Sequence, residues 1–232
     1  MTVTEILFGQ SYYLRFDPKL WDAGQPYPPL GTLYAAAYLR ERGYEVGLFD
    51  AMLAESEAEW AAALDQHRPH YAILFEDNFN YLSKMCLLRM RQAAFEMIAQ
   101  AKSRGCTVIL CGADATDHSL KYFGQGADYV LVGEGEATLG ELMDHLAGRS
   151  DQRPEDILGL AWPGGTAGGE HRNPRRPDIR ELDALPFPAW DLVDVSRYQQ
   201  LWRERHGYYS MNMVTTRGCP YHCNWCAKPI YG

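Results

Sequence analysis

Three cysteines near the end of the chain have the spacing of a metal-binding group. Cys219, Cys223 and Cys226 stand in the run RGCPYHCNWC, a C-x3-C-x2-C pattern. Three thiolates can hold three irons of a cubane iron–sulfur cluster, which leaves the fourth iron open to a small molecule. Structural zinc prefers four ligands, and His222 is poorly placed as the fourth because it lies inside the cysteine loop. We expect an iron–sulfur cluster, with zinc as the alternative and chance proximity as a third interpretation.

The composition is that of a folded protein. The chain has 232 residues, of which 47% are hydrophobic and 22% charged, values that argue against disorder and against a collagen-like fibre. No apolar run approaches the roughly 20 residues of a transmembrane helix, and the N-terminus lacks a signal-peptide pattern. A net charge of −8 gives no general attraction to nucleic acid. We expect a cytoplasmic protein with no nucleic-acid partner and no membrane span, whose clustered cysteines bind metal rather than form disulfides.

Five strongly apolar runs alternate with helical segments over the first 148 residues. The runs are apolar at nearly every position, which is typical of parallel strands buried on both faces, and they cover 5–9, 45–50, 71–76, 107–111 and 128–132. Helical patterns cover 30–42, 55–67, 82–104, 116–123 and 136–146. This alternation predicts an α/β fold: a Rossmann-like, flavodoxin-type, doubly wound parallel sheet with strand order 2-1-3-4-5.

The composition of the chain changes after residue 148, where proline and glycine become frequent. We divide the chain into a Rossmann-like domain at 1–148, a connector at 149–206 and the start of a further domain at 207–232. Within the connector, 157–162 is a candidate strand of a small hairpin whose turn lies in the glycine run. A last β-type run, 208–215, leads directly into the cysteine cluster.

The run TTRGCPYHCNWCAKPIYG resembles the signature of radical S-adenosylmethionine (SAM) enzymes, with Trp225 at its aromatic position. The resemblance implies a [4Fe–4S] cluster on the three clustered cysteines, SAM on the open iron, and one-electron cleavage of SAM to a 5′-deoxyadenosyl radical. It also implies that Trp225 packs near the adenine; the alternative is a hydrophobic plug beside the cluster. By this resemblance, 207–232 holds the first strand and cluster loop of a truncated (β/α) radical SAM barrel. Arg217 and Lys228 supply positive charge near the thiolates.

Most of 27–148 resembles the cobalamin-binding domain that precedes the barrel in one large class of these enzymes. The resemblance rests on YPPLGTLYAAAYLRERGYEV, on CGADAT after the fourth expected strand, and on ADYVLVGEGEATLGEL around the fifth. It implies cobalamin contacts from residues in these motifs and in the loop after the third strand, namely Gly31, Thr32, Asn78, Gly112, Ala113, Asp114, Thr116, Gly133, Glu134, Gly135 and Glu136.

The physical chemistry of these loops agrees with a ligand at the carboxyl ends of the strands, where such sheets bind their ligands. Glycines at 112, 133 and 135 lack side chains where backbone would approach a bulky planar ligand, and Thr116 and Glu136 open helices whose N-termini offer free amide donors. The alternative is that these are ordinary tight turns with helix caps. The loop 10–29 is far longer than a usual strand-to-helix connection and needs a function or a cover to explain it.

No histidine ligand on cobalt is expected. Cobalamin domains that ligate cobalt with histidine carry D-x-H-x-x-G, whereas the run Asp50-Ala51-Met52 has methionine where that motif has histidine. His118 lies in a different loop and is expected at the surface of a helix. The polar run 76–80, which contains Asn78, is the candidate to face the metal, although aspartate and asparagine are equally good turn formers.

Together the two resemblances imply the N-terminal part of a cobalamin-dependent radical SAM enzyme. The commonest activity of that class is methylation of an unactivated carbon or phosphorus, with ring formation or rearrangement as other outcomes, and it implies a small-molecule substrate and an electron donor such as a flavodoxin or ferredoxin. We expect this chain alone to be inactive. The alternative is a cobalamin-binding module with a structural zinc or cluster site and no catalysis of its own. A response-regulator-like domain is disfavoured because the run 7–10 lacks an acidic pair for magnesium.

Overall fold

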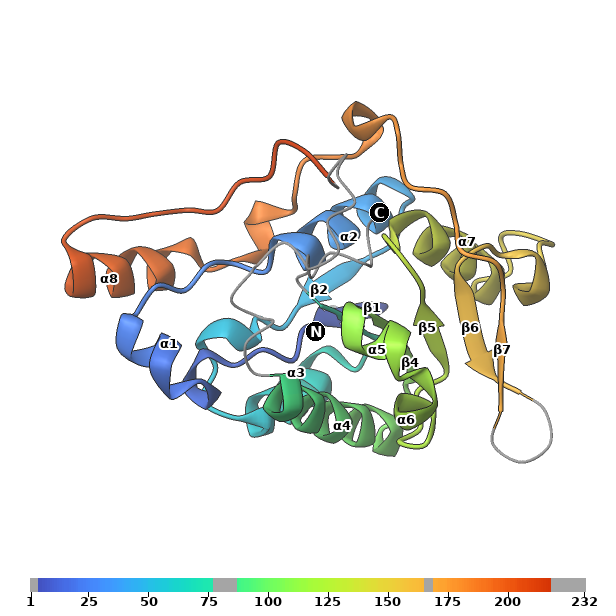
Figure 1. Cartoon of the computed structure of the whole chain (residues 1–232), viewed down its shortest axis with the longest axis horizontal. Helices are drawn as coiled ribbons and strands as arrows, with labels where there is room; N and C mark the ends of the chain where they lie inside the picture. Colours follow the sequence, from blue (N-terminus) through green and yellow to red (C-terminus); the bar gives the residue numbers. More distant parts are fainter. Residues whose placement is uncertain (1–3, 77–86, 165–168, 218–232) are drawn as a thin grey trace, which may run out of the picture.

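A central parallel sheet organises the computed structural model, which describes residues 4–76, 87–164 and 169–217 (Figure 1). Its parallel strands stand in the order β2-β1-β3-β4-β5, which confirms the flavodoxin-type order expected from the sequence. The strands are β1 Ile6–Gly9, β2 Val46–Leu48, β3 Tyr71–Phe75, β4 Thr107–Cys111 and β5 Tyr129–Leu131.

Helices cover both faces of this sheet. On one face lie α2 (Leu30–Glu41) and α7 (Glu136–Leu146), and on the other lie α3 (Glu57–His67) and α4 (Leu87–Ser103) (Figure 1). Along β1, Ile6 and Phe8 belong to one apolar cluster and Leu7 to the other, and all three are fully buried. Burial on both faces explains why nearly every strand residue is apolar.

The helical region after β4 differs from the sequence expectation. A single helix was expected over 116–123, whereas two short helices form: α5 (Ala113–Asp117), which begins three residues earlier, and α6 (Ser119–Phe123). They are separated at His118, whose backbone leaves the helical region with φ −131°. The expected helix 82–104 corresponds to α4, and 82–86 lie outside the described residues.

The long segment after β1 forms a packed cover. It contains a 3-10 turn, Leu14–Phe16, and the short helix α1, Pro18–Ala23. The Asp17 side chain caps α1 by accepting a 3.2 Å hydrogen bond from the Leu20 amide. Tyr12 and Tyr13, at the start of this segment, are almost completely buried. The unusual length of this loop is therefore explained by core packing rather than by an open binding loop.

The connector adds a hairpin to the sheet. After a 3-10 turn at Pro154–Asp156, β6 (Leu160–Pro163) pairs antiparallel with β5, and β7 (Glu170–Arg172) pairs antiparallel with β6. The expected hairpin is confirmed, and it extends the main sheet to seven strands among the described residues. Part of the glycine run, 165–168, lies outside the described residues.

The rest of the connector runs back across the first domain. The connector contains short 3-10 turns at Leu182–Ala184 and Trp190–Leu192, and α8 (Val195–His206) follows. Trp190 belongs to the same apolar cluster as Met52 and Leu53, which lie in a 3-10 turn of the first domain, Ala51–Leu53. Two buried side chains of α8 anchor it: Trp202 donates a 2.7 Å hydrogen bond to the Pro26 carbonyl, and Tyr198 donates one of 2.6 Å to the Asp50 carboxylate. Burial raises the pKa of Asp50, while the hydrogen bond from Tyr198 opposes that rise.

The β-type run 208–215 forms no strand among the described residues. Met211 and Met213 are 44% and 82% exposed. A strand requires a neighbouring strand for its backbone hydrogen bonds. No strand in the described part of the chain pairs with this run, so it does not form a strand despite its β-type residues.

Candidate functional site

Three loops meet at the carboxyl edge of the sheet. The loops after β3, β4 and β5 are in contact there: the Glu76 amide donates a 2.8 Å hydrogen bond to the Cys111 carbonyl, and Gly135 packs on both Cys111 and Phe75. The structure thus brings together the predicted contact residues of two motifs, CGADAT at 111–116 and GEGE at 133–136. It also places the predicted Gly31 and Thr32 in α2, next to the end of β3.

Loop packing already explains two of the three glycines in these motifs. A Cβ at Gly112 would lie 2.8 Å from Cγ of Glu76, and a Cβ at Gly135 would lie 2.5 Å from Sγ of Cys111. Gly135 also has φ +89°, a conformation that glycine adopts readily. At Gly133 a Cβ would make only an ordinary 3.6 Å contact with Arg175, but the backbone there has φ +94°, which itself favours glycine. The close approach that excludes a side chain at 112 and 135 is therefore made by the protein itself.

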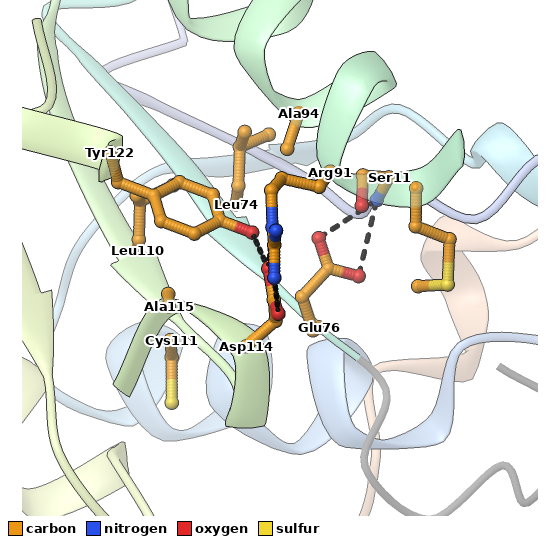
Figure 2. A pocket seen from close by; sticks show the side chains of 11 residues that line it. Ser11, Leu74, Glu76, Arg91, Ala94, Leu110, Cys111, Asp114, Ala115 and Tyr122 are labelled. Carbon is orange, nitrogen blue, oxygen red and sulfur yellow. Dashed lines mark hydrogen bonds and ion pairs between the residues drawn. The ribbon is translucent and has the colours of Figure 1, made fainter. Parts of the chain in front are cut away.

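Asp114, in α5, is fully engaged by neighbouring side chains (Figure 2). Arg91 of α4 holds it with two hydrogen bonds of 2.7 and 2.5 Å, and Tyr122 of α6 donates a third of 2.6 Å. Burial alone would raise the pKa of Asp114, but these hydrogen bonds outweigh it and hold the pKa below its ordinary value. The pocket beside this group has a volume of about 30 Å³, enough for about one water molecule.

Glu76 and Ser11 face each other where the strand order reverses between β1 and β3. The Ser11 amide lies 3.0 and 3.3 Å from the two carboxylate oxygens of Glu76 (Figure 2). This contact joins the loops on the two sides of the crevice in which such sheets bind ligands. The remainder of the polar run 76–80, including Asn78, lies outside the described residues, so its orientation stays a prediction.

Thr32 has a structural partner. Its hydroxyl donates a 2.6 Å hydrogen bond to the Phe75 carbonyl, and both residues are buried, which fixes α2 against the end of β3. Thr116 differs, because its hydroxyl is buried and has no hydrogen-bond partner among the described residues. An unmade hydrogen bond of a buried polar group costs free energy, so Thr116 is the better candidate for a ligand contact.

A buried charge cluster forms at the N-terminus of α7. Arg217 lies 2.5 Å from Oε1 of Glu136 and 3.8 Å from Oε1 of Glu134. The Oε2 atom of Glu136 is buried and has no hydrogen-bond partner among the described residues. Burial raises the pKa of Glu136, and the charge and hydrogen bond of Arg217 oppose this rise.

Sequence reasoning missed both arginines that hold these carboxylates. It placed Arg217 near the thiolates, which lie outside the described residues, and did not foresee that its guanidinium contacts Glu134 and Glu136. Glu134 and Glu136 gave no clear signal of such a partner, because acidic residues are common at the start of a helix. Arg91 gave no such signal either, because its partner Asp114 belongs to another helix.

His118 and the cysteines complete the comparison with the sequence. The side chain of His118 is 43% exposed and lies 3.9 Å from Asp114, which agrees with the expected surface position.

The residues Cys219, Cys223, Cys226 and Trp225 lie outside the described residues. Within the described ranges, no group of three or more His, Cys, Asp or Glu side chains could hold a metal ion. No described helix is long and apolar enough to cross a membrane.

Comparison with known proteins places the first part of the chain in a family. The family described as the B12 binding domain matches residues 20–143, more than half of the chain. An uncharacterized methyltransferase of Pyrococcus horikoshii is 35% identical over 104 residues, which cover 44% of this chain and 20% of that protein. A cytidylyl-2-hydroxyethylphosphonate methyltransferase of Streptomyces wedmorensis is 25% identical over 239 residues, covering 85% of this chain and 43% of that protein.

The fold is also similar to a solved structure. The cobalamin-dependent S-adenosylmethionine radical enzyme OxsB, solved with aqua-cobalamin and S-adenosylmethionine bound, superposes with a TM-score of 0.70 at 17% identity. The match covers 97% of this chain and 28% of OxsB. The chain thus spans less than half the length of the relatives it matches here.

Proposed function

We propose that this chain, which belongs to the family of B12-binding domains, is the N-terminal part of a methyltransferase of the cobalamin-dependent radical SAM class. The activity proposed for the whole protein is methyl transfer to an unactivated carbon or phosphorus of a small-molecule substrate. The observation that carries the proposal is the family match to residues 20–143, which span the carboxyl edge where the CGADAT and GEGE loops meet.

The chemistry of this edge fits cobalamin. The periphery of the corrin carries primary amides, which are hydrogen-bond donors and acceptors. The buried Oε2 of Glu136 and hydroxyl of Thr116 lack partners among the described residues and would bind such amides. Gly133 has a backbone conformation that favours glycine, and its missing side chain would also let backbone approach the corrin. Bound there, cobalamin would supply a transferable methyl group, and no histidine is expected on its cobalt.

Among the remaining predicted contacts, Gly31, Gly112, Ala113, Glu134 and Gly135 would shape the corrin site. Thr32 and Asp114 would act on it indirectly, since their polar groups already bind Phe75, Arg91 and Tyr122. Asn78 is proposed to face the cobalt or a water molecule on it.

We propose Cys219, Cys223 and Cys226 as the ligands of a [4Fe–4S] cluster. Their three thiolates fit a cubane that keeps one iron open, and Trp225 would pack near the adenine of SAM. Bound there, the cluster would pass one electron to SAM, delivered by a donor such as a flavodoxin or ferredoxin. In functional terms the chain divides into the cobalamin domain 1–148, the connector 149–206 and the start of the radical SAM domain at 207–232. We place the protein in the cytoplasm and expect this chain alone to be inactive.

Anaerobic reconstitution with iron, sulfide and hydroxocobalamin tests this proposal. The expected result is one cobalamin per chain together with the broad visible absorbance of an iron–sulfur cluster, and Cys219→Ala abolishes the cluster but leaves cobalamin binding. Stoichiometric zinc without colour would support the alternative, a cobalamin-binding module with a structural zinc site. A chain that binds no cobalamin would overturn the proposal.

A further inference from the structure

Arg217 joins two parts of the chain that the proposed function assigns to different cofactors. On one side it contacts Glu134 and Glu136 in the loop after β5, and on the other the chain continues through Gly218 into Cys219. We infer that Glu134, Arg217 and Glu136, here called the latch, couple the two sites, so that cobalamin and the cluster each strengthen binding of the other. This inference rests on the proposed function and adds a set of positioning residues to it.

The geometry of the latch is that of a specific buried contact. The side chains of Arg217, Glu134 and Glu136 are only 7%, 8% and 2% exposed. Most of the other ion pairs in the described ranges are far more exposed, such as Arg15–Glu55 at 44% and 74%. Exposed pairs contribute little because water screens them, whereas a buried pair fixes the positions of its members.

Two further contacts tie the latch to its surroundings. The Oε2 atom of Glu134 accepts a 2.6 Å hydrogen bond from the Ile179 amide in the connector. The guanidinium of Arg217 lies 5.4 Å from the centre of the Tyr34 ring, on α2. The loop after β5, α2, the connector and the segment leading to the cysteines therefore converge at the latch.

The charges explain why the latch would transmit a change. Two carboxylates lie near one cation in a water-poor site, so withdrawal of Arg217 leaves two like charges buried together. The loop must then move or take up a proton. A cofactor that fixes the loop also fixes the position of Arg217, and a cluster that fixes the cysteine segment also fixes the loop. Such coupling is reciprocal by thermodynamic necessity.

The unpartnered Oε2 of Glu136 strengthens this link. Oε1 of Glu136 binds Arg217, while Oε2 has no partner among the described residues. One carboxylate can therefore contact the cation with one oxygen and a corrin amide with the other. Glu136 would then be the residue through which cobalamin and the cysteine segment sense each other.

The experiment measures the affinity of the complete chain for hydroxocobalamin, by absorbance, with and without the reconstituted cluster. Coupling predicts that the cluster-loaded chain binds cobalamin at least about 5-fold more tightly, the lower end of common coupling factors. In Arg217→Gln the ratio of the two affinities falls to about one. A merely structural ion pair would weaken both affinities together and leave their ratio unchanged.

The matched control is Arg176→Gln. Like Arg217, Arg176 binds a glutamate of α7, in this case Glu141, but it lies in the connector and does not lead into the cysteines. Its ratio of affinities should equal that of the wild type. If Arg217→Gln does not fold, Glu136→Gln serves in its place, since it keeps the size of the side chain and removes the charge.

The outcomes separate the latch from the proposed function. If both cofactors bind the wild-type chain but the affinity ratio is one, or if Arg217→Gln or Glu136→Gln keeps the wild-type ratio, the latch is overturned and the proposed function stands. If the wild-type chain binds no cobalamin or forms no cluster, both are overturned. A ratio lost in these variants and kept in Arg176→Gln supports the latch.

Discussion

Two carboxylates at the carboxyl edge of the sheet, one half-buried and one buried, are bound in different ways. Asp114 receives three hydrogen bonds from Arg91 and Tyr122, both within the Rossmann-like domain. Glu136 is held by Arg217, which comes from the far end of the chain, and one of its oxygens has no partner among the described residues. The contacts of Asp114 are all made within one domain. Glu136 depends on a residue from outside that domain and keeps one oxygen available for a ligand.

Removal of the Asp114 carboxylate should have the largest effect on stability. Asp114→Ala leaves Arg91 as an uncompensated, largely buried cation and should lower the free energy of unfolding by about 4 kcal/mol. Urea denaturation measures this loss. Arg153→Ala, which breaks an exposed pair with Asp156, is the control and should unfold like the wild type. A loss from Asp114→Ala of under about 1 kcal/mol would mean that this contact does not hold the domain together.

Gly135→Ala should be the next most damaging change, because it tests whether the glycine serves packing. The new Cβ would overlap with Sγ of Cys111 in a backbone conformation that alanine disfavours, at a cost of about 3 kcal/mol. Adding Cys111→Ala should relieve part of this cost, so the two changes should not be additive in urea denaturation. Additive losses would show that the overlap is not the cause.

The two carboxylates should also respond to pH with opposite signs. The pKa of Asp114 is lowered in the fold, so its contribution is present above the unfolded value of about 3.9 and is lost as pH falls through the folded pKa. The pKa of Glu136 is raised, so its contribution is present below about 4.3 and is lost as pH rises through the folded pKa.

Urea midpoints measured between pH 3 and pH 8 test these signs. Asp114→Asn should flatten the loss of stability at the acid end, and Glu136→Gln should flatten the loss at the upper end. The same pH profile in both variants would contradict the difference between the two groups.

The smallest effects should come from two threonines that differ in the same way. Thr32→Val removes the hydrogen bond to Phe75 and should destabilise the fold by about 1 kcal/mol, with an indirect effect on cobalamin affinity of under about 2-fold. Thr116→Val removes a hydroxyl with no partner among the described residues, so it should leave stability intact and weaken cobalamin binding by about 5-fold. Thermal unfolding and a cobalamin titration of both variants distinguish these results. Interchanged results would overturn the assignment of the two hydroxyls.

The sheet could be predicted from the sequence because its strands are buried on both faces. Runs apolar at nearly every position mark such strands, and the strand order follows from the alternation with helices, so β1 to β5 and α7 lie where expected. The break at His118 could not be predicted, because Ser119 to Phe123 continue a helical pattern across it. The run 208–215 has the residue types of a strand, but strand formation depends on a partner that local sequence does not reveal.

The proximity of the predicted loops could be inferred from the sequence, but the side-chain contacts within them could not. Sequence patterns place the CGADAT and GEGE loops together because both follow parallel strands, and the structure confirms their proximity. The pairing of Arg91 with Asp114 spans 23 residues and that of Arg217 with Glu136 spans 81. Side-chain periodicity is local, so it carries no information about such partners. The reason for Gly112 and Gly135 likewise lies in neighbouring loops rather than in their own motifs.

The hairpin has a consequence for how the protein behaves in solution. It moves the free border of the sheet from the apolar β5 to β7, which consists of Glu170, His171 and Arg172. The opposite border, β2, is also only three residues long. Short or charged border strands are poor templates for another chain. Deletion of 160–172 should therefore expose Tyr129–Leu131 and promote self-association, which light scattering would detect.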